Sequence, residues 1–235
     1  RRQRLMCIRE RAPDVEEPEV LRAFFSAMNI MKQMHAGMPH SAPLVHAYHD
    51  RSDGGLLATV LEMSFAGRLG LDMDITGILH DTPMAALFNE ELGAVLQVRV
   101  KDVSAVTSVL TSMGVPSNII HTVASVRGDE QINIKCRGET LLSSTRAALQ
   151  KAWADTSFRM QSLRDNPECA KQELAFIDEP AETASLKYEL TFHPAKTLQW
   201  SNPASIERPL ASQPRVAILR EQGVNGHIEM AWAFA

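Results

Sequence analysis

The segment AYHDRSDGGLLATVLEMSFAGRLGLDMDI, residues 47–75, carries the pattern that decides the predicted fold. A short apolar run over 44–48 predicts a strand, and the charged loop 49–55 (HDRSDGG) follows it. Apolar residues then recur at helical spacing from 57 to 65, with Gly67 and Gly70 as expected stops, and 71–75 alternates as a strand does. The segment therefore predicts a strand, a loop, a helix and a second strand in succession.

Helices and strands continue to alternate on both sides of this segment. Upstream, Pro18 suits a first helical position, and apolar residues follow at three- and four-residue spacing until Gly37, the expected stop. Downstream we expect a helix over 81–89, a buried strand over 93–100 and a helix from its cap Asp102 to Met113. Two strands, 119–126 and 131–136, should follow and be joined by a hairpin turn at 127–130. A last helix is expected from Ser143 or Ser144 to Leu163. This order predicts an α/β or α+β fold with a mixed sheet and flanking helices.

Three regions differ in character along the chain. Residues 1–164 hold the predicted domain. Residues 165–213 contain five prolines, many charges and little periodicity, and predict a long linker packed on other surfaces. Residues 214–235 predict a buried strand over 215–219 (RVAIL), a polar loop and a helix from His227, which together resemble the opening of a second domain.

Composition excludes several classes of protein. The 235 residues are 45% hydrophobic and 22% charged, which is typical of a globular chain with a core, and the net charge of -4 offers no positive field for nucleic acid. No apolar run reaches about 18 residues, so no membrane-spanning helix is predicted. Three widely spaced cysteines, Cys7, Cys136 and Cys169, fit neither a disulfide framework nor a zinc site and indicate reduced thiols in a cytoplasmic protein.

The loop 49–55 has the residue types of a metal–phosphate site. Gly54 and Gly55 permit a close approach to the backbone, and amides in the first turn of a helix attract anions. Asp50 and Asp53 are hard oxygen ligands suited to Mg²⁺, and Ser52 can donate to a phosphate oxygen. A purely structural alternative stays open, in which Asp53 caps the helix and Asp50 makes a turn hydrogen bond.

Two further candidates for chemistry are a pair of glutamates in the later motif 86–98 and a histidine beside the loop. Glu90 and Glu91 could act as a paired acid and base or as metal ligands, but the favoured interpretation is a helix end with solvated charges. His49 adjoins the loop and is interpreted as a hydrogen-bonded turn residue. The chain has no nucleotide-binding Gly-x-x-x-x-Gly-Lys-Ser/Thr or Gly-x-Gly-x-x-Gly motif and no His-Glu-x-x-His motif.

Four stretches in order resemble the large, single-chain formylglycinamide ribonucleotide amidotransferases, the phosphoribosylformylglycinamidine synthase family. They are residues 47–75, 86–98 (ALFNEELGAVLQV), 160–173 (MQSLRDNPECAKQE) and 215–234 (RVAILREQGVNGHIEMAWAF). The resemblance runs from about Pro18 to the end. It implies a domain like the C-terminal domain of aminoimidazole ribonucleotide synthetase, from the second synthetase half. A linker and the start of a glutaminase domain would follow, so the chain is expected to be a fragment.

The resemblance also implies a reaction and a site. The family uses ATP, Mg²⁺ and ammonia from glutamine to convert formylglycinamide ribonucleotide to its amidine, in de novo purine biosynthesis. The glutaminase triad would lie beyond Ala235, so no catalytic residue is assigned here. By motif, Asp50 would bind Mg²⁺ and Ser52, Gly54 and Gly55 would bind an auxiliary ATP or ADP. The alternative is a non-catalytic nucleotide-binding or scaffolding module derived from that enzyme.

Overall fold

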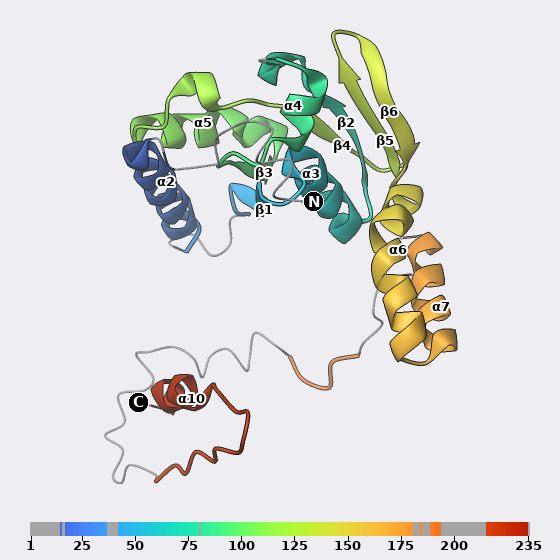
Figure 1. Ribbon diagram of the computed structural model, residues 1–235. Helices are drawn as coiled ribbons and strands as arrows, with labels where there is room; N and C mark the ends of the chain where they lie inside the picture. The colour runs from blue at the N-terminus through green and yellow to red at the C-terminus, as the bar shows by residue number, and fades with distance from the viewer. Residues whose placement is uncertain are drawn as a thin grey trace. The chain divides into compact units, whose positions relative to one another are not determined.

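The computed structural model describes residues 15, 17–36, 42–79, 81–180, 184, 189–193 and 215–234 (Figure 1). The chain divides into two compact units, Arg1–Ser185 and Leu186–Ala235. The first unit contains both sheets and all of the helices except the last one described.

The first unit alternates helices with strands, as the sequence predicts. Its α-helices are α2 (Pro18–Ala36), α3 (Gly55–Gly67), α4 (Pro83–Phe88), α5 (Val103–Ser112), α6 (Arg146–Arg164) and α7 (Pro167–Ala175). Its strands are β1 (Val45–Asp50), β2 (Gly70–Asp74), β3 (Ala94–Val98), β4 (Ala124–Arg127), β5 (Gln131–Cys136) and β6 (Glu139–Thr145). Short 3-10 helices are η1 (Thr76–Ile78), η2 (Val100–Asp102), η3 (Ser117–Ile119) and η4 (Phe176–Asp178).

The larger sheet is mixed and has the strand order β4-β2-β5-β6. Strand β2 is antiparallel to β4 and parallel to β5, and β5 is antiparallel to β6. The mixed sheet is confirmed, but the predicted hairpin at 127–130 is wrong, because β2 lies between β4 and β5. The actual hairpin joins β5 to β6 through Arg137 and Gly138, both at positive φ.

Strand β6 was missed by the sequence prediction. The seven residues 139–145 form an edge strand whose side chains are exposed or half-buried, so they lack the apolar alternation that identifies a strand. The serines expected to cap a helix, Ser143 and Ser144, therefore pair with Asn133 and Ile132 of β5. The cap of α6 is Thr145, whose hydroxyl accepts a hydrogen bond from the Ala148 amide at 3.2 Å.

Two apolar clusters form the core of the first unit. One joins α3 and α4 to the central strands of the mixed sheet, and α3 lies against this sheet in Figure 1. Its buried residues are Leu56, Val60, Leu71, Met73, Ile75, Leu87, Ile132, Ile134 and Cys136. The other joins α2 to α5 and contacts the two-stranded sheet of β1 and β3; its buried residues are Ala23, Ala27, Met31, Val106, Leu110 and Val115.

Two helix ends differ in detail from the predictions. Asp102 lies at the N-cap position of α5 but makes no capping bond, because its carboxylate pairs with Arg99 instead. Helix α3 ends at Gly67 as expected, yet the left-handed residue after it is Arg68, with φ 49°. The Arg68 side chain donates to the carbonyl oxygens of Phe176 and Glu179 at 3.0 and 2.6 Å, and these bonds help to hold that conformation.

Helices α6 and α7 pack side by side, and residues 167–178 are helical although a linker was expected from residue 165 (Figure 1). Arg146, at the start of α6, is fully buried. Its guanidinium donates to Glu130 at 2.7 and 3.0 Å, to Gln150 at 2.7 Å and to the Ile177 carbonyl at 2.9 Å. These bonds connect the turn before β5, helix α6 and η4, which explains why this stretch is ordered against the domain.

The second unit is described over residues 189–193 and 215–234. Helix α10 (His227–Phe234) begins where the sequence predicts. Within the described ranges, residues 215–220 form no strand, and most of their side chains are exposed, so the buried strand predicted over 215–219 is not observed. A strand requires a neighbouring strand to satisfy its amides and carbonyls, and the described part of this unit contains no strand. Among the helices in the described ranges, none combines the length and apolar character needed to span a membrane.

Candidate functional site

The predicted site loop connects the end of β1 to the start of α3. Asp50 is the last residue of β1 and Gly55 is the first residue of α3. The Arg51 amide donates to the Gly93 carbonyl at 2.8 Å, which continues the pairing of β1 with the lead-in to β3. The Gly55 amide donates to the Ser52 carbonyl at 3.0 Å and closes a turn. The loop is thus a tight strand-to-helix turn, as the sequence predicts.

Both glycines of the loop have conformations that require glycine. Gly54 has φ 81° and Gly55 has φ 67°, in the left-handed region. A Cβ at Gly55 would lie 2.6 Å from the Phe88 carbonyl carbon and 2.7 Å from the Leu87 oxygen. From the sequence, both glycines are expected to admit a ligand. At Gly55, the close approach is made by the backbone of α4 instead.

The loop is bound to a segment almost forty residues away. The Arg51 guanidinium donates to the Glu91 carbonyl at 2.6 Å and to the Leu92 carbonyl at 2.9 Å. Burial lowers the pKa of Arg51, and the Glu91 carboxylate opposes that shift. In return, the Gly54 amide donates to the Glu90 carboxylate at 3.0 Å. The favoured interpretation of Glu90 as a solvated charge is therefore wrong, because its carboxylate contacts the loop; Glu91 is exposed.

Asp50 presents its carboxylate to solvent beside a series of hydrogen bonds that connects β1, α3 and α6. The Asp50 side chain is 67% exposed and lies 3.8 Å from His49 Nδ1. The His49 Nε2 atom is 2.7 Å from a Glu62 oxygen, and Trp153 Nε1 donates to the other Glu62 oxygen at 3.2 Å. His49 is therefore a strand residue linked to α3 and α6, and not the turn residue expected.

The structural alternative for the loop is not supported in its predicted form. Gly54 occupies the N-cap position of α3 and makes no side-chain capping bond, so Asp53 is not the cap. Asp50 contributes its backbone carbonyl, which accepts from the Thr59 hydroxyl at 3.4 Å. Ser52 is exposed. The structure thus brings Asp50, Ser52 and Gly54 onto one short turn, on which the side chains of Asp50, Ser52 and Asp53 are exposed.

The donor set fits a magnesium–phosphate group only in part. Mg²⁺ is commonly held by one or two carboxylates together with phosphate oxygens and water. Asp50 supplies one accessible carboxylate. Within the described residues, no group of three or more His, Cys, Asp or Glu side chains is arranged to hold a metal ion. The loop can therefore contribute the exposed carboxylates of Asp50 and Asp53, and the remaining ligands would have to be phosphate, water or other residues.

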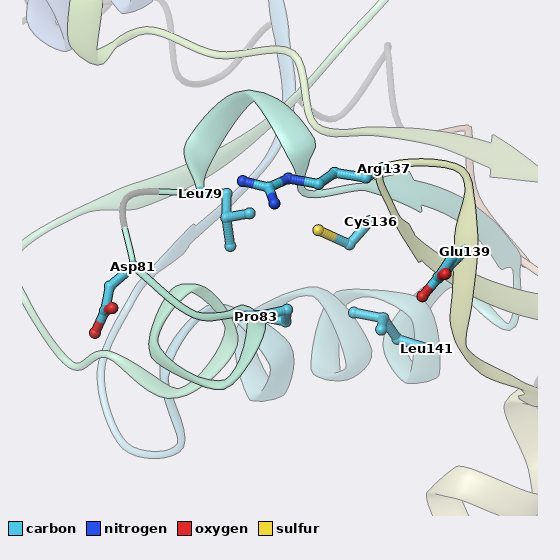
Figure 2. Close-up of a pocket in the computed structure, with 7 residues that line it drawn as sticks. All are labelled: Leu79, Asp81, Pro83, Cys136, Arg137, Glu139 and Leu141. Atoms are coloured by element: carbon cyan, nitrogen blue, oxygen red, sulfur yellow. The ribbon is translucent and has the colours of Figure 1, made fainter.

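A separate hollow lies between the loop that precedes α4 and the β5–β6 turn (Figure 2). Its volume is about 350 Å³, and it contains none of the predicted site residues. In Figure 2 the Cys136 sulfur points into the space bounded by Leu79, Pro83 and Leu141, while Asp81 and Glu139 lie on either side of it. The described cysteines, Cys136 and Cys169, are free thiols, as expected.

Sequence reasoning missed the contribution of Arg51 and Glu90 to this site. The motifs that contain them, 49–55 and 86–98, were both identified, but no local pattern indicates that they touch. The pairing of β1 with β3 brings them together: Asp50 lies opposite Ala94 in that register. The only sequence signal for this contact was that β1 and β3 both appear as strand-like apolar runs of similar length.

The fold and the turn define a class: a mixed α/β domain with a glycine-containing strand–loop–helix turn at its candidate site. A family model described as "AIR synthase related protein, C-terminal domain" matches residues 12–132, about half of the chain, and this range includes the loop and Glu90. The chain belongs to this family.

Two curated relatives of this chain carry the same name. The chain is 40% identical to the phosphoribosylformylglycinamidine synthase of Schizosaccharomyces pombe over 227 residues, which is 96% of this chain and 16% of that protein. It is 39% identical to the Saccharomyces cerevisiae protein of the same name, over 95% of this chain and 16% of that protein. The chain therefore spans about one sixth of the length of these relatives. A solved structure of Thermotoga maritima PurL complexed with ATP is 18% identical with a TM-score of 0.47, and the match covers 58% of this chain and 22% of that chain.

Proposed function

We propose that this chain is part of an ATP- and glutamine-dependent carbon–nitrogen ligase that forms formylglycinamidine ribonucleotide in purine biosynthesis. The observation that carries the proposal is the similarity, along almost the whole chain, to two phosphoribosylformylglycinamidine synthases. The alternative of a non-catalytic nucleotide-binding or scaffolding module is not favoured, because both relatives are named as the enzyme.

In this proposal the loop 50–55 serves a nucleotide. Asp50 would hold Mg²⁺ through its accessible carboxylate. Ser52 would donate its hydroxyl to a phosphate oxygen, and Gly54 would place the backbone of the turn beside the phosphates. Gly55, packed against Leu87 and Phe88, would shape that turn. Bound Mg²⁺ would offset the negative charge of those phosphates. The electrostatic reason for this placement is the partial positive charge at the N-terminus of α3.

The remaining parts of the reaction are assigned outside this chain. Formylglycinamide ribonucleotide and glutamine would bind in other domains of the protein, and residues 214–235 would begin the glutaminase domain that releases ammonia. The residues after η4, up to 213, would connect it to the synthetase domain, because α7 and η4 pack against α6 of that domain. The free thiols of Cys136 and Cys169 support a cytoplasmic location, where cysteines remain reduced.

The site can be tested by titrating the protein with Mg-ADP in a calorimeter. Asp50→Asn removes the proposed metal ligand and is expected to weaken Mg-ADP binding on the order of tenfold, which corresponds to about 1.4 kcal/mol. Asp81→Asn is the matched control, because Asp81 is an exposed carboxylate at the other hollow. With EDTA present, the two variants should bind ADP equally. Equal losses in both variants with Mg²⁺ present would refute the assignment of Asp50.

The ligase activity needs a separate measurement. The whole enzyme of which this chain is proposed to be a part should form the amidine from formylglycinamide ribonucleotide, ATP and glutamine, with one ADP released for each product molecule. If Mg-ADP binds but no amidine forms, the ligase assignment fails while the nucleotide site stands.

A further inference from the structure

We propose that Arg51 and Glu90 are reciprocal positioning residues, which hold the loop 50–54 in the shape that its nucleotide-binding role requires. This inference rests on the proposed function, because it concerns how that site is built. Neither residue is assigned a contact with the ligand.

Arg51 fixes the centre of the loop through both its backbone and its side chain. Its amide donates to the Gly93 carbonyl at 2.8 Å, and its guanidinium donates to the carbonyls of Glu91 and Leu92 at 2.6 and 2.9 Å. Three successive carbonyls of one segment are therefore bound by one residue. A Cβ added at Gly93 would lie 3.1 Å from Arg51 Nε, so the absence of a side chain there allows the close approach.

Glu90 binds the loop in the opposite direction. Its carboxylate accepts the Gly54 amide at 3.0 Å. Gly54 is the residue at which the chain turns from loop to helix, and its φ is 81°. This conformation is only one of several that a glycine can adopt. A hydrogen bond from this amide to a charged acceptor favours the observed state over the others. Glu90 thus holds the end of the loop that Arg51 does not reach.

The proposed ligand-binding side chains depend on this support. Asp50 and Ser52 flank Arg51 in sequence, and both are exposed. Within the part of the chain that the structure describes, neither the Ser52 hydroxyl nor the Asp50 carboxylate has a hydrogen-bond partner. The Asp50 carboxylate lies 3.8 Å from His49 Nδ1, and burial together with the Asp50 charge raises the pKa of Tyr48. Their positions are therefore set by the backbone between Asp50 and Gly54, which Arg51 and Glu90 hold.

The test combines amide hydrogen exchange with Mg-ADP titration of the protein. Glu90→Ala should accelerate exchange at the Gly54 amide and weaken Mg-ADP binding, each by about three- to tenfold, the range expected for loss of one hydrogen bond. Glu91→Ala is the matched control: it removes the neighbouring carboxylate but leaves the carbonyl that Arg51 binds. It should change neither quantity.

Conservative substitutions separate positioning from direct ligand contact. Glu90→Gln keeps an oxygen acceptor without the charge, and should restore at least half of the Gly54 protection and of the affinity that Glu90→Ala loses. Arg51→Lys keeps the charge but cannot donate to two carbonyls in the same way, and should weaken Mg-ADP binding as Glu90→Ala does.

Several results would overturn the inference. Equal weakening by Glu90→Ala and Glu91→Ala would show a general charge effect. Tighter binding in Glu90→Ala would show that Glu90 competes with phosphate, and failure of Glu90→Gln to restore binding would show that the charge itself contacts the metal or ligand. If the unmodified protein bound no Mg-ADP, the proposed function would fail, and exchange at Gly54 would still decide whether Glu90 orders the loop.

Discussion

Replacing Gly55 with alanine should destabilise the protein more than the same change at any glycine in open space. Gly55 has φ 67°, and the left-handed conformation costs a residue with a Cβ about 1–2 kcal/mol. The new Cβ would also lie 2.6–2.7 Å from the backbone of Leu87 and Phe88, at the end of α4. Backbone cannot rotate away as a flexible side chain can. Forced overpacking of this kind adds about 1–3 kcal/mol, so the expected total is about 2–5 kcal/mol.

Two other glycines separate these contributions. Gly138 has φ 83° and no atom within 4 Å of an added Cβ, so Gly138→Ala should cost only the conformational part, about 1–2 kcal/mol. Gly128 lies in open space without a left-handed φ, so Gly128→Ala should change the stability by less than about 0.5 kcal/mol.

Urea unfolding followed by tryptophan fluorescence measures the three free energies. Trp153 packs on Phe65 of α3 with ring centroids 5.9 Å apart, so its emission reports on the helix that Gly55 begins. The order of losses should be Gly55, then Gly138, then Gly128. A loss at Gly55 no larger than that at Gly138 would refute the argument that the backbone of α4 excludes a side chain there.

Three further predictions follow from other contacts. Gly54→Val should weaken Mg-ADP binding in a titration and also lower the melting temperature. Valine does not tolerate the φ of 81°, and its Cβ would lie 2.8 Å from the Cβ of Ala58. Unchanged binding and melting would contradict this prediction. Arg146→Met should cost about 3–5 kcal/mol in urea unfolding because it leaves a carboxylate without its buried partner, whereas Arg159→Met, which breaks an exposed pair on the same helix, should cost no more than about 0.5 kcal/mol. Hydrogen bonds from Arg127 lower the pKa of Asp129 to about 2, against about 3.9 in an unfolded chain. Because the folded pKa is the lower one, the stabilisation is present above about pH 4 and is lost as the pH falls toward 2. Arg127 also pairs with Asp72, so the variant that isolates this carboxylate is Asp129→Asn. The melting temperature of the unmodified protein should converge on that of Asp129→Asn over this pH range, and a constant difference would exclude the Asp129 pair as the cause.

The candidate loop shows how far local sequence could predict a site. Asp50, Ser52, Gly54 and Gly55 were identified because a strand, a turn and a helix follow one another without interruption, and each leaves a local pattern. Their assignment to metal and nucleotide stays a prediction. Glu90 was interpreted as solvated, because nothing in residues 86–93 indicates that a carboxylate there accepts the amide of Gly54.

The sequence by itself determined the elements with a strong period and clear ends. The apolar stripe after Pro18 predicted α2, and the pattern after Gly55 predicted α3, because helix formation depends on residues three and four apart along the chain. The domain type, too, was evident from motifs that are contiguous in sequence, and the match of residues 12–132 to the C-terminal domain of AIR synthase related proteins confirms it.

Only the tertiary structure decided which strands pair and which loops meet. Strand β2 enters between β4 and β5 although about fifty residues separate it from either. Strand β6 was invisible because an edge strand with exposed side chains carries little apolar alternation. The contact between Gly54 and Glu90 depends on the antiparallel register of β1 and β3. Backbone groups are the same in every residue, so strand pairing is selected by the burial of the whole sheet and not by any short segment of sequence.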